Sequence, residues 1–172
     1  KLLTEANITT ATKISDYAFY IYTHLTSITI GNNVTSIGEY AFSGCTAKIK
    51  WGDNPTITSI GSYAFDGYAG TSITIPDSVK DIGDSAFYNC RSLTSITIPD
   101  SVMNIGESAF YNCGSLTSIT IGNSVTSIES NAFWGCSSLT TVYYKGTQAE
   151  WGKISIGINN SYLTNANIIL FK

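Results

Sequence analysis

The sequence predicts a mainly β protein, a right-handed solenoid built from repeats of 22 to 23 residues. An isoleucine stands five residues before each of six regularly spaced phenylalanines, and a short stretch of alternating polar and apolar residues follows most of them. The six phenylalanines each end an Ala-Phe dipeptide: Phe19, Phe42, Phe65, Phe87, Phe110 and Phe133. A repeat of this length cannot bury its apolar side alone, so the repeats are expected to stack around one continuous core.

Each repeat is expected to add one strand to a single parallel main sheet. Residues 94–98 alternate polar and apolar side chains, as a half-buried strand does. Equivalent strands are expected near residues 26–30, 47–51, 71–75, 117–121 and 140–144. The recurring Val-x-x-Ile-Gly stretch favours a shorter strand ladder on the opposite wall, and residues 107–111 are long enough for about one helical turn.

The position two residues after each phenylalanine predicts a backbone in the left-handed region. Glycine and asparagine exchange there, and these two types tolerate a positive φ better than other residues. The residues concerned are Gly44, Gly67, Asn89, Asn112 and Gly135. Ile21 takes this place in the first repeat, so we expect that repeat to be distorted.

The whole chain, residues 1–172, is predicted to be one domain with unlike ends. Residues 1–13 are expected to form a degenerate opening rung, residues 14–144 the repeats, and residues 145–172 a C-terminal cap. Within the cap, Thr147 and Glu150 match a capping box, which predicts the start of a short helix. The segment 166–171 is then expected to add a last strand at the sheet edge.

The repeat resembles the BspA-like, or Treponema-type, leucine-rich repeat family. The shared pattern is Leu-x-x-Ile-x-Ile-Pro-x-x-Val-x-x-Ile-Gly-x-x-Ala-Phe-x-x-Cys, and the tail 143–166 is similar to the closing segment common in that family. The resemblance implies a leucine-rich-repeat solenoid in a surface or secreted bacterial protein, in a family where several members are associated with adhesion. It implies an extracellular or cell-surface location and brings no catalytic motif.

The composition argues against nucleic acid as a partner and against insertion into a membrane. Charged residues make up 12% of the chain and the net charge is −3, so no basic groove for nucleic acid is expected. No apolar run approaches the roughly 20 residues of a membrane span, so we expect no membrane insertion by this segment. The chain opens with Lys1 rather than Met, and we expect any signal peptide or anchor to lie outside it.

Residues suited to catalysis or metal binding are sparse, so we expect no enzyme, no cofactor and no metal site. His24 is the only histidine, and it is interpreted as a partly exposed turn residue. A glycosidase needs two carboxylates in a cleft. The carboxylates here are instead scattered over predicted turns: Asp77, Asp81, Asp84, Asp100 and Glu107.

Four cysteines follow the repeating phenylalanine by three residues: Cys45, Cys90, Cys113 and Cys136. Tyrosine replaces cysteine at this position in the first and third repeats, which isolates Cys45 from the rest. We therefore expect free, buried thiols that act as small apolar fillers, in place of disulfides or a zinc site.

Two surfaces are candidates for ligand binding. On the main sheet, the residues that point away from the core form two columns rich in Ser and Thr, interrupted by two lysines and one tyrosine. The expected ligand-binding face consists of Lys48, Lys50, Ser72, Thr74, Ser95, Thr97, Ser118, Thr120, Thr141 and Tyr143. A merely solvated sheet face is the alternative interpretation.

The second surface is an aromatic wall. Positions two residues before and one residue after the phenylalanine are three apart, so on a helical turn they would share a face. From the second repeat on, one of the two positions is aromatic in each repeat: Tyr40, Tyr63, Tyr88, Tyr111 and Trp134. This compensation indicates either a packing position or an aromatic binding stripe.

The leading functional hypothesis is a non-catalytic binding module that attaches to a protein or glycan on a host or neighbouring cell. A passive spacer within a larger surface protein is the first alternative. Ice binding by the Ser/Thr columns is a remote alternative, and a glycoside hydrolase is the least favoured.

Overall fold

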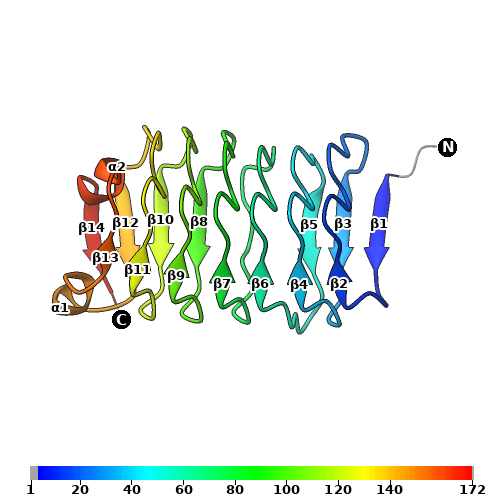
Figure 1. The fold of residues 1–172 in the computed structure, drawn as a ribbon, viewed down its shortest axis with the longest axis horizontal. Coiled ribbons are helices and arrows are strands. Elements are labelled where there is room, and N and C mark those ends of the chain that lie inside the picture. The colour runs from blue at the N-terminus through cyan, green and yellow to red at the C-terminus, as the bar shows by residue number, and fades with distance from the viewer. Residues whose placement is uncertain (1–3, 172) are drawn as a thin grey trace.

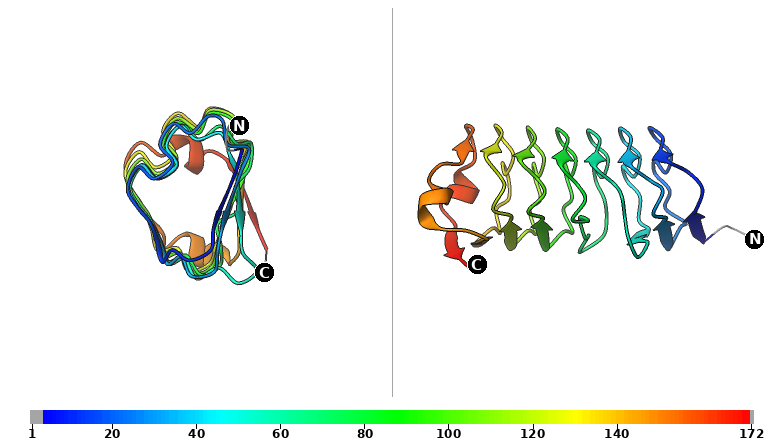
Figure 2. Two further views of the ribbon diagram at one scale, coloured as in Figure 1. Left: turned by 90° about the vertical axis from the view of Figure 1, so that its right-hand side faces the viewer. Right: turned by 90° about the horizontal axis from the view of Figure 1, so that it is seen from below.

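The computed structural model describes residues 4–171 as a stack of rungs wound along one axis (Figure 1). Viewed along that axis, the backbone outlines of successive rungs nearly superimpose (Figure 2). Each repeated rung has a main-sheet side, a short strand ladder and a turn that joins them, which we call the outer-wall turn. The predicted parallel β-solenoid is confirmed.

The main sheet contains seven parallel strands of four residues, in two groups. The first group, in the order β1-β3-β5, consists of β1 (Glu5–Ile8), β3 (Ser27–Ile30) and β5 (Lys48–Trp51). The second, in the order β14-β12-β10-β8, consists of β8 (Ser95–Ile98), β10 (Ser118–Ile121), β12 (Thr141–Tyr144) and β14 (Asn167–Leu170). The residues expected to face solvent pair in register, as in Ser118 with Thr141.

The sheet is divided where a strand was expected near residues 71–75, and that expectation is wrong. Only an isolated bridge between Ser72 and Ser95 forms there. β5 begins six residues after Phe42, whereas β3 and β8 begin eight residues after Phe19 and Phe87, and β5 nevertheless pairs with β3 in register. The sheet resumes at β8, whose Ser95 forms the bridge to Ser72.

A second sheet of two-residue strands runs along the opposite wall without a break. Its order is β13-β11-β9-β7-β6-β4-β2. The strands are β2 (Lys13–Ile14), β4 (Ser36–Ile37), β6 (Ser59–Ile60), β7 (Asp81–Ile82), β9 (Asn104–Ile105), β11 (Ser127–Ile128) and β13 (Ser155–Ile156). The isoleucine of the Val-x-x-Ile-Gly stretch ends each of the six strands from β2 to β11, and in every one it is buried. The short ladder that the sequence predicted is confirmed.

The outer-wall turns are not helical, in contrast to the helical turn expected at residues 107–111. Their ranges are 15–22, 38–45, 61–68, 83–90, 106–113 and 129–136. Main-chain N–H groups alternate in direction along each turn. The N–H of Tyr111 donates to the carbonyl of Ser108 within the turn, whereas the N–H of Phe110 donates to the carbonyl of Ala132 in the next rung. A helix would direct all of these donors back into the same turn, so the alternation is what binds rung to rung here.

Two left-handed residues in each outer-wall turn make this alternation possible. Asn89 and Asn112 have φ angles of 54° and 60°, as their exchange with glycine predicted. The expected distortion at Ile21 is wrong, because Ile21 adopts the same conformation with φ of 55°. A second left-handed column, two residues before each phenylalanine, was not predicted: Tyr17, Tyr40, Tyr63, Ser85, Ser108 and Asn131.

The phenylalanine column forms the spine of the core. Consecutive rings from Phe19 to Phe133 stack with centroid distances of 5.1–5.3 Å and interplanar angles of 13° or less. All of these rings except Phe19 are fully buried. Truncation of such a ring in a packed core costs about 3–5 kcal/mol.

The cysteine column lies beside the phenylalanines. All four cysteines are free and buried, as predicted. The thiols of Cys90, Cys113 and Cys136 donate to the carbonyl oxygens of Phe65, Phe87 and Phe110 at 3.0–3.1 Å. A hydrogen bond with Cys113, together with burial, raises the pKa of Cys136, and burial raises the pKa of Cys45. These thiols are therefore poor nucleophiles at neutral pH.

The C-terminal end contains two short helices, α1 (Gln148–Trp151) and α2 (Ser161–Thr164), that cover the last rung (Figure 1). The predicted capping box is confirmed, because Thr147 and Glu150 exchange hydrogen bonds at the start of α1. The last strand is also confirmed, since β14 pairs with β12. The indole ring of Trp151 packs edge-on against Tyr144 at a centroid distance of 5.2 Å.

Candidate functional site

The outward columns of the main sheet form a regular polar surface on β8, β10 and β12. Ser95 aligns with Ser118 and Thr97 with Thr120, so their side chains repeat along the stack at the strand spacing of about 4.8 Å. Every residue of the predicted sheet-face site is exposed or half-buried. Their main chains, except at residues 72 and 74, are held in ladder hydrogen bonds, which gives this face a rigid backbone.

Lys48 and Lys50 lie on the other side of the sheet break from most of this surface. Both are exposed on β5, in register with Ser27 and Thr29. Four rung steps separate them from Tyr143 on β12, a span of about 19 Å at the usual strand spacing. The structure therefore does not bring the lysines and Tyr143 into one compact pocket, and a ligand that contacts both must be extended.

A hollow of 250 Å³ marks the sheet break next to Lys48. Its lining includes hydroxyl groups that precede β3 and β5 and others from the segment that forms no strand: Thr26, Thr46, Tyr68, Thr71 and Ser72. Tyr68 occupies the position of the missing cysteine, and its ring lies so close to Gly70 that no side chain would fit at that glycine. The indole N–H of Trp51 donates to the carbonyl of Thr74 at 2.7 Å, which bridges the break where strand pairing is absent.

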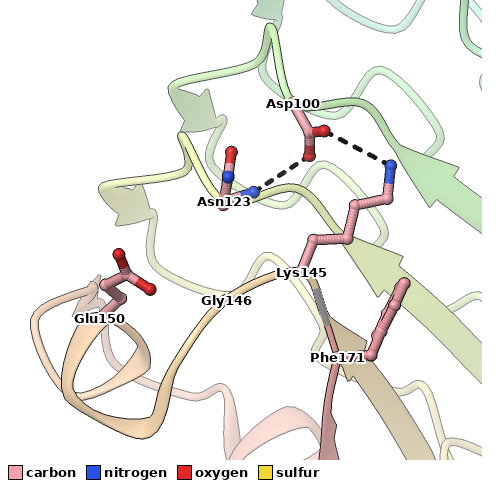
Figure 3. A pocket seen from close by; sticks show the side chains of 6 residues that line it. All are labelled: Asp100, Asn123, Lys145, Gly146, Glu150 and Phe171. Carbon is pink, nitrogen blue, oxygen red and sulfur yellow. Dashed lines mark hydrogen bonds and ion pairs between the residues drawn. The ribbon is translucent and has the colours of Figure 1, made fainter.

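A second, larger hollow of 560 Å³ lies at the C-terminal end, where the sequence indicated only scattered turn residues (Figure 3). Lys145 forms an ion pair with Asp100 at 3.6 Å, and Asp100 also accepts a hydrogen bond from the main-chain N–H of Asn123 at 3.2 Å. Phe171, which is exposed, also lines the hollow. Lys145 and Phe171 occur outside the repeats, so no column could reveal this site in the sequence.

Phe171 also connects this hollow with the sheet face. Its ring meets Tyr143 edge-on at a centroid distance of 6.4 Å. Tyr143 and Phe171 are 38% and 41% exposed, so this pair offers an aromatic surface at one end of the Ser/Thr columns. Exposed aromatic groups beside hydroxyl and charged groups are typical of binding surfaces.

Ring contacts join five rungs along the aromatic wall, from Tyr17, which was not among its predicted residues, to Tyr111, and Trp134 is exposed in the rung after them. Tyr17, Tyr40 and Tyr63 stack at centroid distances of 5.2 and 4.7 Å, and Tyr88 and Tyr111 stack at 4.7 Å. The two stacks meet between Tyr63 and Tyr88 at 6.0 Å, where the aromatic residue changes position within the repeat. The prediction that both positions share one face is confirmed, although the turn that carries them is not a helix.

Three carboxylates lie next to the aromatic wall. Glu39, Asp84 and Glu107 line a hollow of 400 Å³ together with Tyr63. Asp84 has a structural role, because it accepts a hydrogen bond from the N–H of Glu107 at 2.9 Å. Burial raises the pKa of Asp66, although the Ser43 hydroxyl acts in the opposite direction.

The lining residues of this 400 Å³ hollow include neither the histidine nor a cysteine of the chain. His24 is exposed. In this part of the chain, no three His, Cys, Asp or Glu side chains lie close enough to hold a metal ion. Within the same residues, no helix is both long and apolar enough to cross a membrane.

Comparison with known families supports the repeat assignment. The model of the "BspA type Leucine rich repeat region" matches residues 12–140 and 58–169, with six copies. No curated protein sequence matches the chain.

Solved structures show the same fold. A leucine-rich repeat protein from Bacteroides ovatus is 28% identical with a TM-score of 0.64, over 98% of this chain and 55% of that one. The leucine-rich repeat protein of T. pallidum is 27% identical with a TM-score of 0.54, over 81% and 58%. A leucine-rich cell surface protein from Faecalibacterium prausnitzii is 24% identical with a TM-score of 0.53, over 89% and 62%, and shows the fold alone. The chain thus spans about half to three-fifths of the length of these proteins.

Proposed function

Since this chain belongs to the BspA-type leucine-rich repeat family, we propose that it is a non-catalytic binding module that attaches to a protein or glycan on a host or neighbouring cell. We place it outside the cell or at the cell surface, as a single domain with an opening rung at 1–13, repeats at 14–144 and a cap at 145–172. The family resemblance, which implies a surface or secreted bacterial protein, supports this location.

The observation that carries the proposal is the rigid, outward-facing main sheet. Its hydroxyl side chains stand on a backbone held by strand pairing, so binding there requires little ordering of the protein. Single hydroxyl hydrogen bonds contribute little net energy. The exceptions to the Ser/Thr pattern should therefore supply the affinity and the selectivity: Lys48, Lys50 and Tyr143.

Among these exceptions, the lysines favour an anionic group. They are two of nine basic residues in a chain of net charge −3, and both are exposed on one strand. At the far end, Tyr143 and Phe171 provide an aromatic contact. An extended ligand with negative groups at one end and an apolar or sugar-ring face at the other fits this arrangement.

Ice binding is disfavoured by the sheet break. Both columns are interrupted by Lys48 and Lys50 and by the unpaired segment near Ser72, so an unbroken Ser/Thr surface extends over few rungs. Hydrolysis of glycosides is disfavoured because the carboxylates on the aromatic wall hold main-chain groups or lie along a solvent-exposed groove.

An array of glycans and extracellular-matrix proteins, probed with the purified chain, tests the proposal. Selective binding to one class, lost when the protein is unfolded, supports a binding module. Absence of binding throughout the array, by a protein with native circular dichroism, would favour a passive spacer within a larger surface protein.

A further inference from the structure

Lys145 and Phe171 depart from the repeat pattern at the same edge of the main sheet, and both line the hollow of 560 Å³ that we call the C-terminal hollow. They directly follow β12 and β14, and the N–H of Phe171 donates to the carbonyl of Tyr144 at 3.0 Å, which continues the strand pairing by one residue. The residues that follow β10 and β8 are Gly122 and Pro99, which carry no polar side chain. A lysine and an aromatic ring thus take the place of inert residues here.

Asp100 has a carboxylate oxygen that the turn of the repeat does not require. One oxygen accepts a hydrogen bond from the N–H of Asn123 at 3.2 Å, and Asn32 forms the same kind of bond to the N–H of Asn54 at 3.1 Å with its single amide oxygen. The other oxygen of Asp100 lies 3.6 Å from Nζ of Lys145 (Figure 3). The Asp100 side chain is 52% exposed, so its carboxylate is held in position by two partners and still has lone pairs open to a ligand.

The charges that line the C-terminal hollow are balanced. Lys145 pairs with Asp100, and Glu150 lines the same hollow. An adjoining hollow of 160 Å³ shares Asn123 and Glu150 with the first and adds Lys153. Two lysines therefore accompany two carboxylates, so the net charge favours neither an anionic nor a cationic ligand.

An uncharged sugar ring fits these features. Phe171 is 41% exposed and offers an aromatic face on which the C–H groups of a pyranose can pack. Asp100 accepts and Lys145 donates hydrogen bonds, which suits two neighbouring hydroxyls, because each hydroxyl can do both. The 560 Å³ of the hollow lie within the range of about 300–1,000 Å³ that is usual for small-ligand sites.

We propose that the C-terminal hollow binds a neutral pyranose. Its ring packs on Phe171, and two adjacent hydroxyls form hydrogen bonds with Asp100 and Lys145. The adjoining hollow receives a second sugar unit. This inference rests on the proposed binding function and selects a glycan as the ligand, since the contact between Phe171 and Tyr143 joins the hollow to the main-sheet face.

Nuclear magnetic resonance titration of the labelled protein tests the inference. The probes are the methyl glycosides of glucose, galactose, mannose and N-acetylglucosamine. We expect at least one of them to bind with a dissociation constant of about 10 mM or tighter. The amide signals of Lys145 and Gly146 should shift most, because both residues line the C-terminal hollow.

Two variants remove the groups that carry the inference. Asp100→Asn keeps an acceptor for the N–H of Asn123 but removes the charged oxygen next to Lys145, and Phe171→Ser removes the aromatic face. Each should weaken binding by about tenfold or more, with native circular dichroism, because exposed ion pairs and exposed rings contribute little to stability. The matched control is Asp77→Asn, at the equivalent exposed position one rung earlier and outside the hollow, which should leave the affinity unchanged.

Absence of binding by every sugar of the panel, or unchanged affinity in Asp100→Asn and Phe171→Ser, would overturn the inference. So would tighter binding of methyl glucuronide than of methyl glucoside, because a carboxylate would then be preferred to a neutral group. In each of these cases, selective binding on the array that Lys48→Ala combined with Lys50→Ala abolishes would still support the proposed function of the main sheet.

Discussion

The side-chain oxygen of Asn160 accepts a hydrogen bond from the N–H of Phe133, in the place that an alanine carbonyl takes in every earlier rung. A single side chain thereby imitates the backbone of a rung that does not follow. The C-terminal end of the solenoid is closed by this substitution as well as by apolar cover from Leu163, which is fully buried.

Asn160→Ala is expected to lower the free energy of unfolding by about 1–3 kcal/mol, because the N–H of Phe133 loses its partner in a buried place. Urea unfolding followed by circular dichroism measures the change. Asn165→Ala, at an exposed position after α2, is the control and should change stability by less than about 0.5 kcal/mol. Equal effects of the two substitutions would contradict the capping role.

A second prediction concerns the left-handed position two residues after each phenylalanine of the repeat. Asn112→Ala should destabilise the protein by about 1–2 kcal/mol, since alanine tolerates a φ of 60° poorly. Asn112→Gly relieves the backbone strain and loses only the side-chain bond to Asn89 at 2.9 Å, so it should be much less harmful. If glycine proves as destabilising as alanine in urea unfolding, the side-chain bond and not the backbone conformation accounts for asparagine here.

The thiols predict a pH dependence of stability. Folding raises the pKa of Cys45 and Cys136, so the folded state keeps protons that the unfolded state releases above a pKa of about 8.5. Their contribution is complete below that pH and is lost as the pH rises further. The free energy of unfolding should therefore fall between pH 8 and pH 10, and less steeply in Cys136→Ala. A stability that is constant or rises over this range would be inconsistent with buried, protonated thiols.

Thiol titration tests whether the four cysteines are free and buried. In the native protein, we expect an aromatic disulfide reagent to react slowly with all four cysteines, because each is buried. After unfolding without a reductant, four thiols should titrate. Recovery of only two would mean that a disulfide forms, against the geometry of the column.

Repetition explains what the sequence predicted well. The phenylalanine column, the exchange of Asn112 with glycine and the free cysteines each rest on six or more comparable positions. The second left-handed column escaped prediction because Tyr40 and Ser85 carry no preference for positive φ, and only Asn131 hinted at it. Inter-rung hydrogen bonds, which are invisible in one rung, impose this conformation.

Features that occur only once in the chain could not be predicted, because no repeated position indicates them. At the sheet break, Trp51 donates a hydrogen bond to the carbonyl of Thr74, and the ring of Tyr68 lies against Gly70. The hollow around Asp100 and Lys145 brings together residues far apart in the sequence. None of these arrangements recurs, so no periodic pattern signals them.

The most direct test of the central claim is calorimetric titration of a ligand found on the array, with three variants of matched native circular dichroism. We predict that Lys48→Ala combined with Lys50→Ala, and separately Tyr143→Ser, each weaken binding at least tenfold, or about 1.4 kcal/mol, while Tyr111→Ser leaves it unchanged. Unchanged affinity in the first two variants, with a loss in Tyr111→Ser, would contradict the assignment of the main sheet and place the site on the aromatic wall.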